Sequence, residues 1–294
     1  MIRTALGAAF LLASAAQVGA TVCGHPAVRF IDSVPIADKK RGFTEPSGLS
    51  LSDEPGSLLS VSDDTAALFS LTFDGKHLRG LDPEIEHRDL EGIALDPAGK
   101  RILTVSEKAA ALQVIDFDTQ TSREIALADM RGYELVRPAF EKSDPNDRLE
   151  GIAIDTARDR IFLLKEKRPR LLLEVSSDLS EIRRVTELTP ALGFVDDDQP
   201  DRHLDVSGAT VDVATGCLWI VSDRGERLFL FDPRSDTAAR SYALGWLDGN
   251  KARGILHAEG IAHDPATDRL FVINDDGKSS RLFTFEILRD GVTR

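Results

Sequence analysis

Acidic residues recur in this chain at a constant spacing that could build a cation site. Five stretches each contain a glycine preceded by Glu or Ser, and an Asp or Glu lies sixteen residues after that Glu or Ser. Oxygen ligands without a cluster of Cys and His favour Ca²⁺, and less strongly Mg²⁺, over zinc. The five pairs are Ser47 and Asp63, Glu91 and Glu107, Glu150 and Glu166, Ser207 and Asp223, and Glu259 and Asp275.

The pairs lie in internal repeats whose pattern predicts β-hairpins. The stretch DLEGIALDPAGKRILTVSEK begins at Asp89, RLEGIAIDTARDRIFLLKEK begins at Arg148, and related stretches begin at Glu45, Asp205 and His257. Each has two apolar runs separated by a turn of Asp, Pro, Gly or similar residues, which is typical of a hairpin. A third apolar run follows every hairpin, and a fourth follows in most units. This repetition predicts an all-β fold, a five-bladed β-propeller of four-stranded blades.

The two ends of the repeat region predict how the ring closes. The last unit ends at its third strand, RLFTFEIL, and the strand-like AVRFIDSVPI of residues 27–36 precedes the first unit. Because closure removes exposed sheet edges, we expect this N-terminal strand to complete the last blade. An open β-solenoid, the alternative, would not need the spare strand. We therefore expect a single propeller domain over residues 24–294.

The predicted fold brings the acidic pairs together. A hairpin places its two ends side by side, and ring closure gathers all five blade ends around one mouth of the central channel. Carboxylates gathered in this way repel and raise one another's pKa, and a bound cation relieves the repulsion. We favour the inner glutamates Glu91, Glu150 and Glu259 as ligands, and regard the later acids and the two serines as further candidates. The alternative is that the early glutamates bond backbone amides or pair with nearby basic residues, which are Lys108, Lys165, Lys167, Arg168 and Arg224.

Three histidines are weak candidates for catalysis. His87, His203 and His257 each precede a predicted inner strand by a few residues. An imidazole at the channel mouth could act as a general base. A surface or hydrogen-bonded histidine is the commoner situation, so the sequence assigns no catalytic residue.

The N-terminal residues predict export. Residues 1–20 combine Arg3, an apolar run and the small residues Val18-Gly19-Ala20, which is the pattern of a secretory signal peptide. The apolar run is short for a membrane anchor, which needs about 20 residues. We therefore expect a periplasmic or secreted protein, or a membrane-associated one, without a membrane span in the mature chain. In an oxidising compartment Cys23 and Cys217 could form a disulfide, although two cysteines can also remain unpaired.

Composition limits the classes of partner. The formal net charge is −13, and 42% of the residues are hydrophobic, which is enough for a folded core. Nucleic acid is excluded as a partner because binding to phosphates needs a basic surface. Cations, a small molecule or a periplasmic protein fit the acidic balance better.

Several phrases together resemble one protein family. DLEGIALD, LEGIAID with KEKRPRLLLEV, DVSGATVD and AEGIAHD follow one another as in the SdiA-regulated family of bacterial β-propellers. The resemblance covers nearly the whole chain after residue 20, and it implies an exported or membrane-associated five-bladed propeller with a calcium site. Glu91, Glu150 and Glu259 match the family's Glu-Gly positions. Arg148 stands where the second unit has Asp89, so this outer position varies. A more distant resemblance is to phytase-like esterase propellers and calcium-dependent lactonases.

Two functions remain open from the sequence. The first is a ligand- or protein-binding module with a metal at the channel mouth, because propellers often serve as rigid platforms. The alternative is a calcium-dependent hydrolase, an esterase, lactonase or phosphoesterase, in which the cation polarises a substrate oxygen at the same site. The sequence has no G-x-S-x-G motif, so a nucleophile elbow is not expected.

Overall fold

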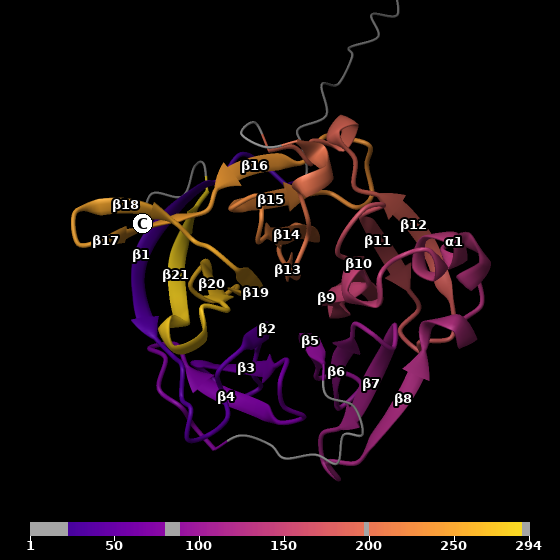
Figure 1. Ribbon diagram of the computed structural model, residues 1–294, viewed down its shortest axis with the longest axis horizontal. Helices are drawn as coiled ribbons and strands as arrows, with labels where there is room; N and C mark the ends of the chain where they lie inside the picture. Colours follow the sequence, from indigo (N-terminus) through magenta and orange to yellow (C-terminus); the bar gives the residue numbers. More distant parts are fainter. Residues whose placement is uncertain (1–22, 80–88, 197–199, 290–294) are drawn as a thin grey trace, which may run out of the picture.

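Five antiparallel β-sheets surround a central axis in the computed structural model, which describes residues 23–79, 89–196 and 200–289 (Figure 1). Each sheet is one sequence repeat, numbered here blade 1 to blade 5 in chain order, and its first strand lies nearest the axis. These inner strands contact one another in ring order. The all-β, five-bladed propeller is therefore confirmed. The inner strands are β2 (Pro46–Leu51), β5 (Leu90–Asp96), β9 (Leu149–Asp155), β13 (Gly208–Asp212) and β19 (Ala258–Asp264).

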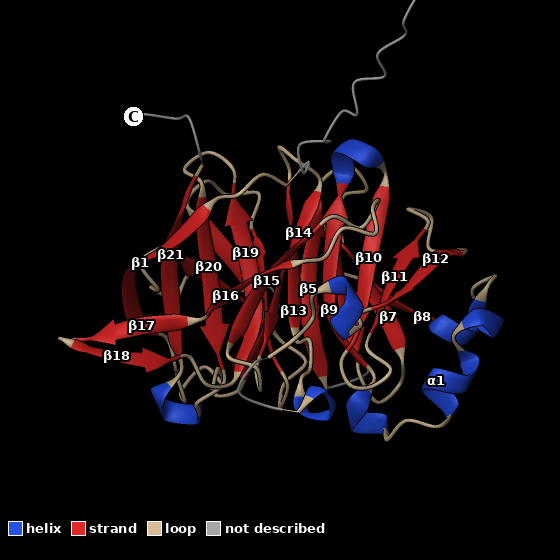
Figure 2. Ribbon diagram, turned by 90° about the horizontal axis from the view of Figure 1, so that it is seen from above, coloured by secondary structure: helices blue, strands red, loops and turns tan. Residues whose placement is uncertain are grey.

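The remaining strands of each blade lie farther from the axis in chain order, as expected for a meander. Figure 2 shows the strands running between the two faces of the disc. Blade 1 continues with β3 (Ser57–Ser62) and β4 (Leu68–Thr72), blade 2 with β6 (Arg101–Ser106), β7 (Ala111–Asp116) and β8 (Ser122–Ala126), blade 3 with β10 (Arg160–Lys165), β11 (Leu171–Val175) and β12 (Ile182–Glu187), blade 4 with β14 (Cys217–Ser222), β15 (Arg227–Phe231) and β16 (Arg240–Ala243), and blade 5 with β20 (Arg269–Asn274) and β21 (Arg281–Leu288).

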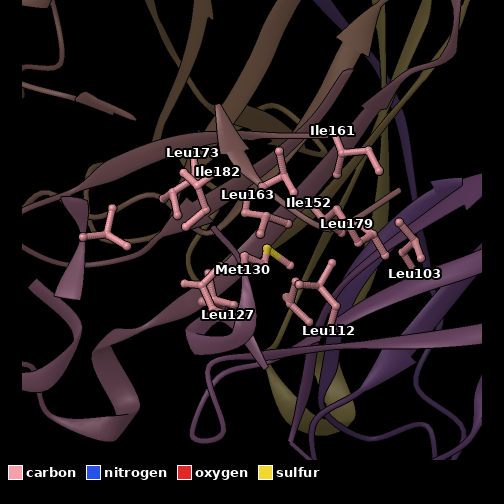
Figure 3. Packing of buried hydrophobic residues seen from close by; sticks show 14 of the residues in the cluster. Leu103, Leu112, Leu127, Met130, Ile152, Ile161, Leu163, Leu173, Leu179 and Ile182 are labelled. Carbon is pink, nitrogen blue, oxygen red and sulfur yellow. The ribbon is translucent and has the colours of Figure 1, made fainter. Parts of the chain in front are cut away.

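The core consists of apolar layers between neighbouring blades. The second strand of a blade is packed on both faces, which explains why β10 and β14 are apolar almost without interruption and buried throughout. One layer joins Leu103 and Leu112 of blade 2 to Ile152 and Leu163 of blade 3 (Figure 3). Corresponding layers join the other pairs of neighbouring blades. Each blade is therefore held mainly by its two neighbours.

The anchor glycines let the inner strands touch. A Cβ atom added at Gly48 would lie 2.4 Å from the carbonyl oxygen of Glu91, and one added at Gly92 would lie 2.5 Å from that of Glu150. At Gly208 the corresponding distance to the carbonyl oxygen of Glu259 would be 2.3 Å. Real Cβ atoms do not approach backbone this closely, so each of these contacts requires glycine.

The N-terminal strand closes the ring as predicted. Strand β1 (Ala27–Pro35) pairs antiparallel with β21, so blade 5 is built from both ends of the chain. The hydroxyl of Tyr242 donates a hydrogen bond to the carbonyl oxygen of Pro26 at 2.9 Å. A disulfide joins Cys23 to Cys217 on β14, which ties the residues before β1 to blade 4. The cysteine pairing that the sequence left open is therefore present in the structure.

Three features depart from a regular set of four-stranded blades. An additional hairpin of β17 (Gly245–Asp248) and β18 (Lys251–Gly254) is inserted in the chain between blades 4 and 5. Helix α1 (Arg137–Glu141) lies in the long connection between blades 2 and 3 (Figure 2). The described residues of blade 1 form three strands, followed by a single bridge between Leu71 and His77.

Within the ranges that the structure describes, no helix is long and apolar enough to cross a membrane. The predicted signal peptide of residues 1–20 lies outside these ranges.

Loss of the disulfide should destabilise the ring. The bond spans 194 residues of sequence, for which the chain-entropy treatment gives an upper value of roughly 5 kcal/mol. We expect the double variant Cys23→Ser/Cys217→Ser to unfold at a lower temperature than the wild type in thermal denaturation followed by circular dichroism. Dithiothreitol should lower the Tm of the wild type and leave that of the double variant unchanged. An identical Tm for oxidised and reduced wild type would contradict a stabilising role.

Candidate metal centre

The predicted site residues lie at one face of the disc, where the inner strands begin. In the register of blade 2, Leu90 pairs with Ser106, so Glu91 and Glu107 lie at the same end of the hairpin. The same holds in blade 3, where Leu149 pairs with Lys165. We call this face the acidic face, and the opposite one, where the inner hairpins turn, the turn face. The sequence prediction that each hairpin returns its late acid to the early residue is thus met in the fold.

A register irregularity accompanies each inner glutamate. The pairing of the first two strands shifts between Leu90 and Ile93, between Leu163 and Lys165, and between Ala258 and Gly260. Such β-bulges turn a side chain away from the regular alternation of the sheet. Asp89 and His257, each two residues before an inner glutamate, have positive φ values of 77° and 54°. The sequence predicted strands here but not the bulges, which alter the direction of the glutamates.

Two clusters of three carboxylates form at this face. One oxygen from each of Asp63, Asp89 and Glu91 lies within 4.8 Å of the others, and the same is true of a second cluster. Each cluster combines an inner glutamate with the late acid of the preceding blade, because the anchor glycine of one blade contacts the inner strand of the next. We call them the Glu91 cluster (Asp63, Asp89, Glu91) and the Glu150 cluster (Glu107, Glu150, Glu166).

Burial and mutual repulsion raise the pKa values of these acids. Removal from water raises the pKa of Glu107 to about 8 and that of Glu166 to about 7. The pKa values of Glu91, Glu150 and Glu259 are also well above the ordinary range, first through desolvation and then through nearby carboxylates. The three inner glutamates are half-buried and not fully enclosed. These groups are therefore costly to ionise together and accessible to a small cation.

Basic residues neutralise only part of this charge. Lys108 pairs with Asp89, and the Nζ atom of Lys167 lies 2.8 Å from Glu166 and 2.7 Å from Asp147. In the described part of the chain, no ion pair joins a Lys or Arg to the three inner glutamates.

Other basic side chains near the mouth form contacts with groups outside the two clusters. The Nζ atom of Lys165 donates to the backbone carbonyls of Asp147 and Lys167, at 2.8 and 2.7 Å. Arg168 pairs with Asp201 at 3.4 Å, and Arg224 lies 3.7 Å from Asp205. The alternative of neutralisation by nearby lysines and arginines thus applies to the rim and not to the centre.

The remaining predicted ligand candidates, Asp223, Ser47, Ser207 and Asp275, make different kinds of contact. The carboxylate of Asp223 is the strongest charged influence on the pKa of Glu259, again a late acid acting on the next blade. Ser47 donates its hydroxyl to the carbonyl oxygen of Glu45 at 3.2 Å. Ser207 donates its hydroxyl to the carbonyl oxygen of Ala258 at 2.5 Å, which holds two inner strands together. Asp275 accepts a hydrogen bond from the backbone of Gly277.

The histidine candidates have no contact with either cluster in the part of the chain that is described. His257 is exposed, and its Nδ1 atom lies 2.9 Å from the carbonyl oxygen of Asp275. His203 is exposed in the short 3₁₀ turn Asp201–His203. His87 lies outside the described residues. Their proposed role as a general base stays an untested prediction.

The raised pKa values predict a pH dependence of stability in a chelator. Glu107 and Glu166 keep a proton in the folded state that they lose near pH 4.5 in the unfolded chain. The contribution of these two groups to the free energy of unfolding is therefore fully present below about pH 4.5, and it is lost as the pH rises through about 7 to 8. We expect urea denaturation in excess EDTA to show a free energy of unfolding that falls between pH 5 and pH 8. The fall should be smaller in Glu107→Gln, and equal slopes for both proteins would contradict the assignment.

Proteins of known structure share the fold at low sequence identity. A glutaminyl cyclase from Myxococcus xanthus superposes with a TM-score of 0.59 at 13% identity, over 90% of this chain and 97% of that chain. A chain of a nidogen–laminin complex gives 0.51 at 13% identity, over 90% and 98%. A PQQ-bound aldose sugar dehydrogenase from Streptomyces coelicolor gives 0.50 at 14% identity, over 90% and 98%. At these identities the likeness shows the fold alone.

A family match covers most of the chain. The model of the SdiA-regulated family matches residues 31–283. This range contains all five inner strands and both carboxylate clusters. The chain therefore belongs to the SdiA-regulated family.

Proposed function

We propose that this protein is an exported calcium-binding propeller that serves as a ligand- or protein-binding module, with Ca²⁺ at the acidic mouth of the channel. The observation that carries the proposal is the Glu150 cluster. Three carboxylate oxygens from two blades lie within 4.8 Å of one another, and Glu150 has no basic partner among the described residues. A hard cation is the simplest group that offsets this repulsion.

The donor set suits calcium better than other metals. Both clusters offer carboxylate oxygens only, whereas transition metals generally take imidazole or thiolate ligands. Calcium accepts about 6–8 oxygens in flexible geometry, so water or backbone oxygens would complete its shell. Glu107, Glu150 and Glu166 would hold the ion, with Glu91 and Glu259 close enough to influence it electrostatically. When bound, the cation would neutralise the mouth and present a positive centre to oxygen atoms of a ligand.

A pocket at the outer part of blade 3 supports a role in binding. A cavity of about 590 Å³ lies between α1 and the outer strands of blade 3, and its lining includes Leu135, Lys142, Asp147 and Arg168. Asp147 reaches Glu166 of the cluster through the shared ion pairs of Lys167. A ligand in this pocket would therefore be connected to the cluster through Asp147 and Lys167, and it would contact the long connection where loops on a rigid scaffold commonly carry recognition.

Export is supported by two independent observations. Residues 1–20 have the composition of a secretory signal peptide. The disulfide between Cys23 and Cys217 would be stable in an oxidising compartment such as the periplasm and is unusual in the cytosol.

Metal binding should appear as calcium-dependent stability. At a free Ca²⁺ concentration 100 times Kd, binding adds about 2.7 kcal/mol, which corresponds to a Tm increase of roughly 5–10 °C for a domain of this size. We expect this increase with Ca²⁺, and a smaller one with Mg²⁺, when the chelated protein is titrated in a thermal-shift measurement.

Two variants make the test specific. Glu150→Gln should abolish the calcium response and, in chelator at pH 8, should unfold at a higher temperature than the wild type because a buried charge is removed. Glu54→Gln, which changes an exposed acid in the turn between β2 and β3 of blade 1, should behave as the wild type. Calcium stabilisation that survives Glu150→Gln would place the ion elsewhere, and no response to any metal would overturn the proposal. Turnover of ester, lactone or phosphoester substrates that Glu150→Gln loses would favour the hydrolase alternative.

A further inference from the structure

The cavity between α1 and blade 3, called here the α1 pocket, has walls from two parts of the chain. Its volume of about 590 Å³ lies within the range of about 300–1,000 Å³ that is usual for ligand pockets. One wall comes from α1 and the residue that follows it, and contributes Pro138, Ala139 and Lys142. The other comes from β12 and contributes Val185 and Glu187. Figure 1 shows α1 beside the outer strands of this blade.

The register of the strands places apolar and charged side chains together on the β12 wall. In the pairing of β11 with β12, Leu173 lies opposite Val185 and Leu171 lies opposite Glu187. Opposed residues of an antiparallel pair project from the same side of the sheet, so these four side chains share one face. Ala139 of α1 packs against the same core layer as Leu171 and Leu173. The pocket therefore has an aliphatic floor, with the exposed Glu187 beside it.

Most charged groups of the lining have partners within the protein. Asp147 pairs with Lys167 at 2.7 Å, and Arg168 lies 3.4 Å from Asp201. The side chain of Asp144 accepts a hydrogen bond from the backbone amide two residues later. These groups are therefore less available to a ligand than a charge without a partner.

Lys142 and Glu187 are the remaining charged residues of the lining. Both are exposed, and neither side chain has an ion pair or a hydrogen bond with another residue in the described part of the chain. One is a cation on the α1 wall, and the other is an anion on the β12 wall. A ligand that complements this arrangement has a carboxylate, an ammonium group and an apolar part that contacts the floor.

We propose that the α1 pocket binds a short apolar peptide with free termini, with its carboxylate at Lys142 and its amino group at Glu187. The side chains of the peptide would contact Leu171, Val185 and Leu135, of which Leu135 is 63% exposed. A volume of about 590 Å³ lies in the middle of the range for drug-sized ligands, which favours a peptide of a few residues over a single amino acid. The inference rests on the proposed binding function and names the class of ligand for it.

Peptide binding can be measured separately from calcium binding. Lys142 and Glu187 belong to neither carboxylate cluster. We therefore expect the peptide to bind in excess EDTA and to the Glu150→Gln variant, as well as to the calcium-treated wild type. Peptide binding without calcium stabilisation would overturn the calcium centre alone. Calcium stabilisation without peptide binding would overturn the present inference alone.

The test compares probes that differ by one charge or by their apolar side chains. Isothermal titration calorimetry would measure binding of the tripeptide leucyl-alanyl-leucine, of its N-acetylated form and of its C-terminal amide. We expect each blocked form to bind about three- to fivefold more weakly than the free peptide, the ratio that one exposed ion pair supplies. Triglycine, which keeps both termini and lacks the apolar side chains, should also bind more weakly. Equal affinities for the free and blocked peptides, or no binding of the free peptide, would overturn the proposal.

Two variants at exposed positions, which should leave the fold intact, assign each terminus to its partner. Lys142→Gln should bind the free peptide and the amide equally, and should still bind the acetylated form more weakly. Glu187→Gln should show the reverse pattern, with equal affinity for the free and acetylated peptides and a weaker affinity for the amide. Glu54→Gln in blade 1 serves as the control and should behave as the wild type. Wild-type preferences in both pocket variants would refute the site.

Discussion

The contact between an anchor glycine of one blade and the backbone of the next is the constraint on which the rest of the structure depends. It brings the five inner strands so close that a single added carbon atom would not fit at Gly48, Gly92 or Gly208. The residue preceding each glycine is carried to the axis with it. The crowding of Glu91, Glu150 and Glu259 is therefore a consequence of how tightly the ring is closed, and cannot be relieved without loosening the ring.

The same geometry limits how the negative charge of the acidic mouth can be relieved. Carboxylates that cannot move apart must be protonated, paired with a basic group or bridged by a cation. Lysines at the rim form ion pairs with Asp89 and Glu166. The inner glutamates have no such partner among the described residues, so protonation or a bridging cation is what remains for them. Protons and the proposed cation would compete for the same oxygens, which would connect the electrostatics of the mouth to the stability of the whole disc through the blade contacts.

The sequence predicted the fold and the composition of the acidic mouth because both follow from a short-range repeat. The constant spacing of early residue and late acid is a property of one hairpin, and it could be recognised without knowing how blades pack. Contacts between residues of different blades could not be predicted in this way. The proximity of Glu150 to Glu107 of the preceding blade depends on the offset between two sheets. The hairpin β17–β18 was missed although Gly249-Asn250 is a typical two-residue hairpin turn, because its strands are mostly exposed and lack alternation.

The pairing of β1 with β21 has a consequence for the order of folding. The first strand to leave the ribosome finds its partner only when nearly the whole domain has been made, because Ala27 pairs with Leu288. Until then β1 is an open edge, and blade 5 cannot form completely. Blades 2 to 4 have no such dependence, since each is continuous in the chain. Completion of the ring is thus a late, long-range event, and a chain that stops before β21 would contain folded blades without a closed channel.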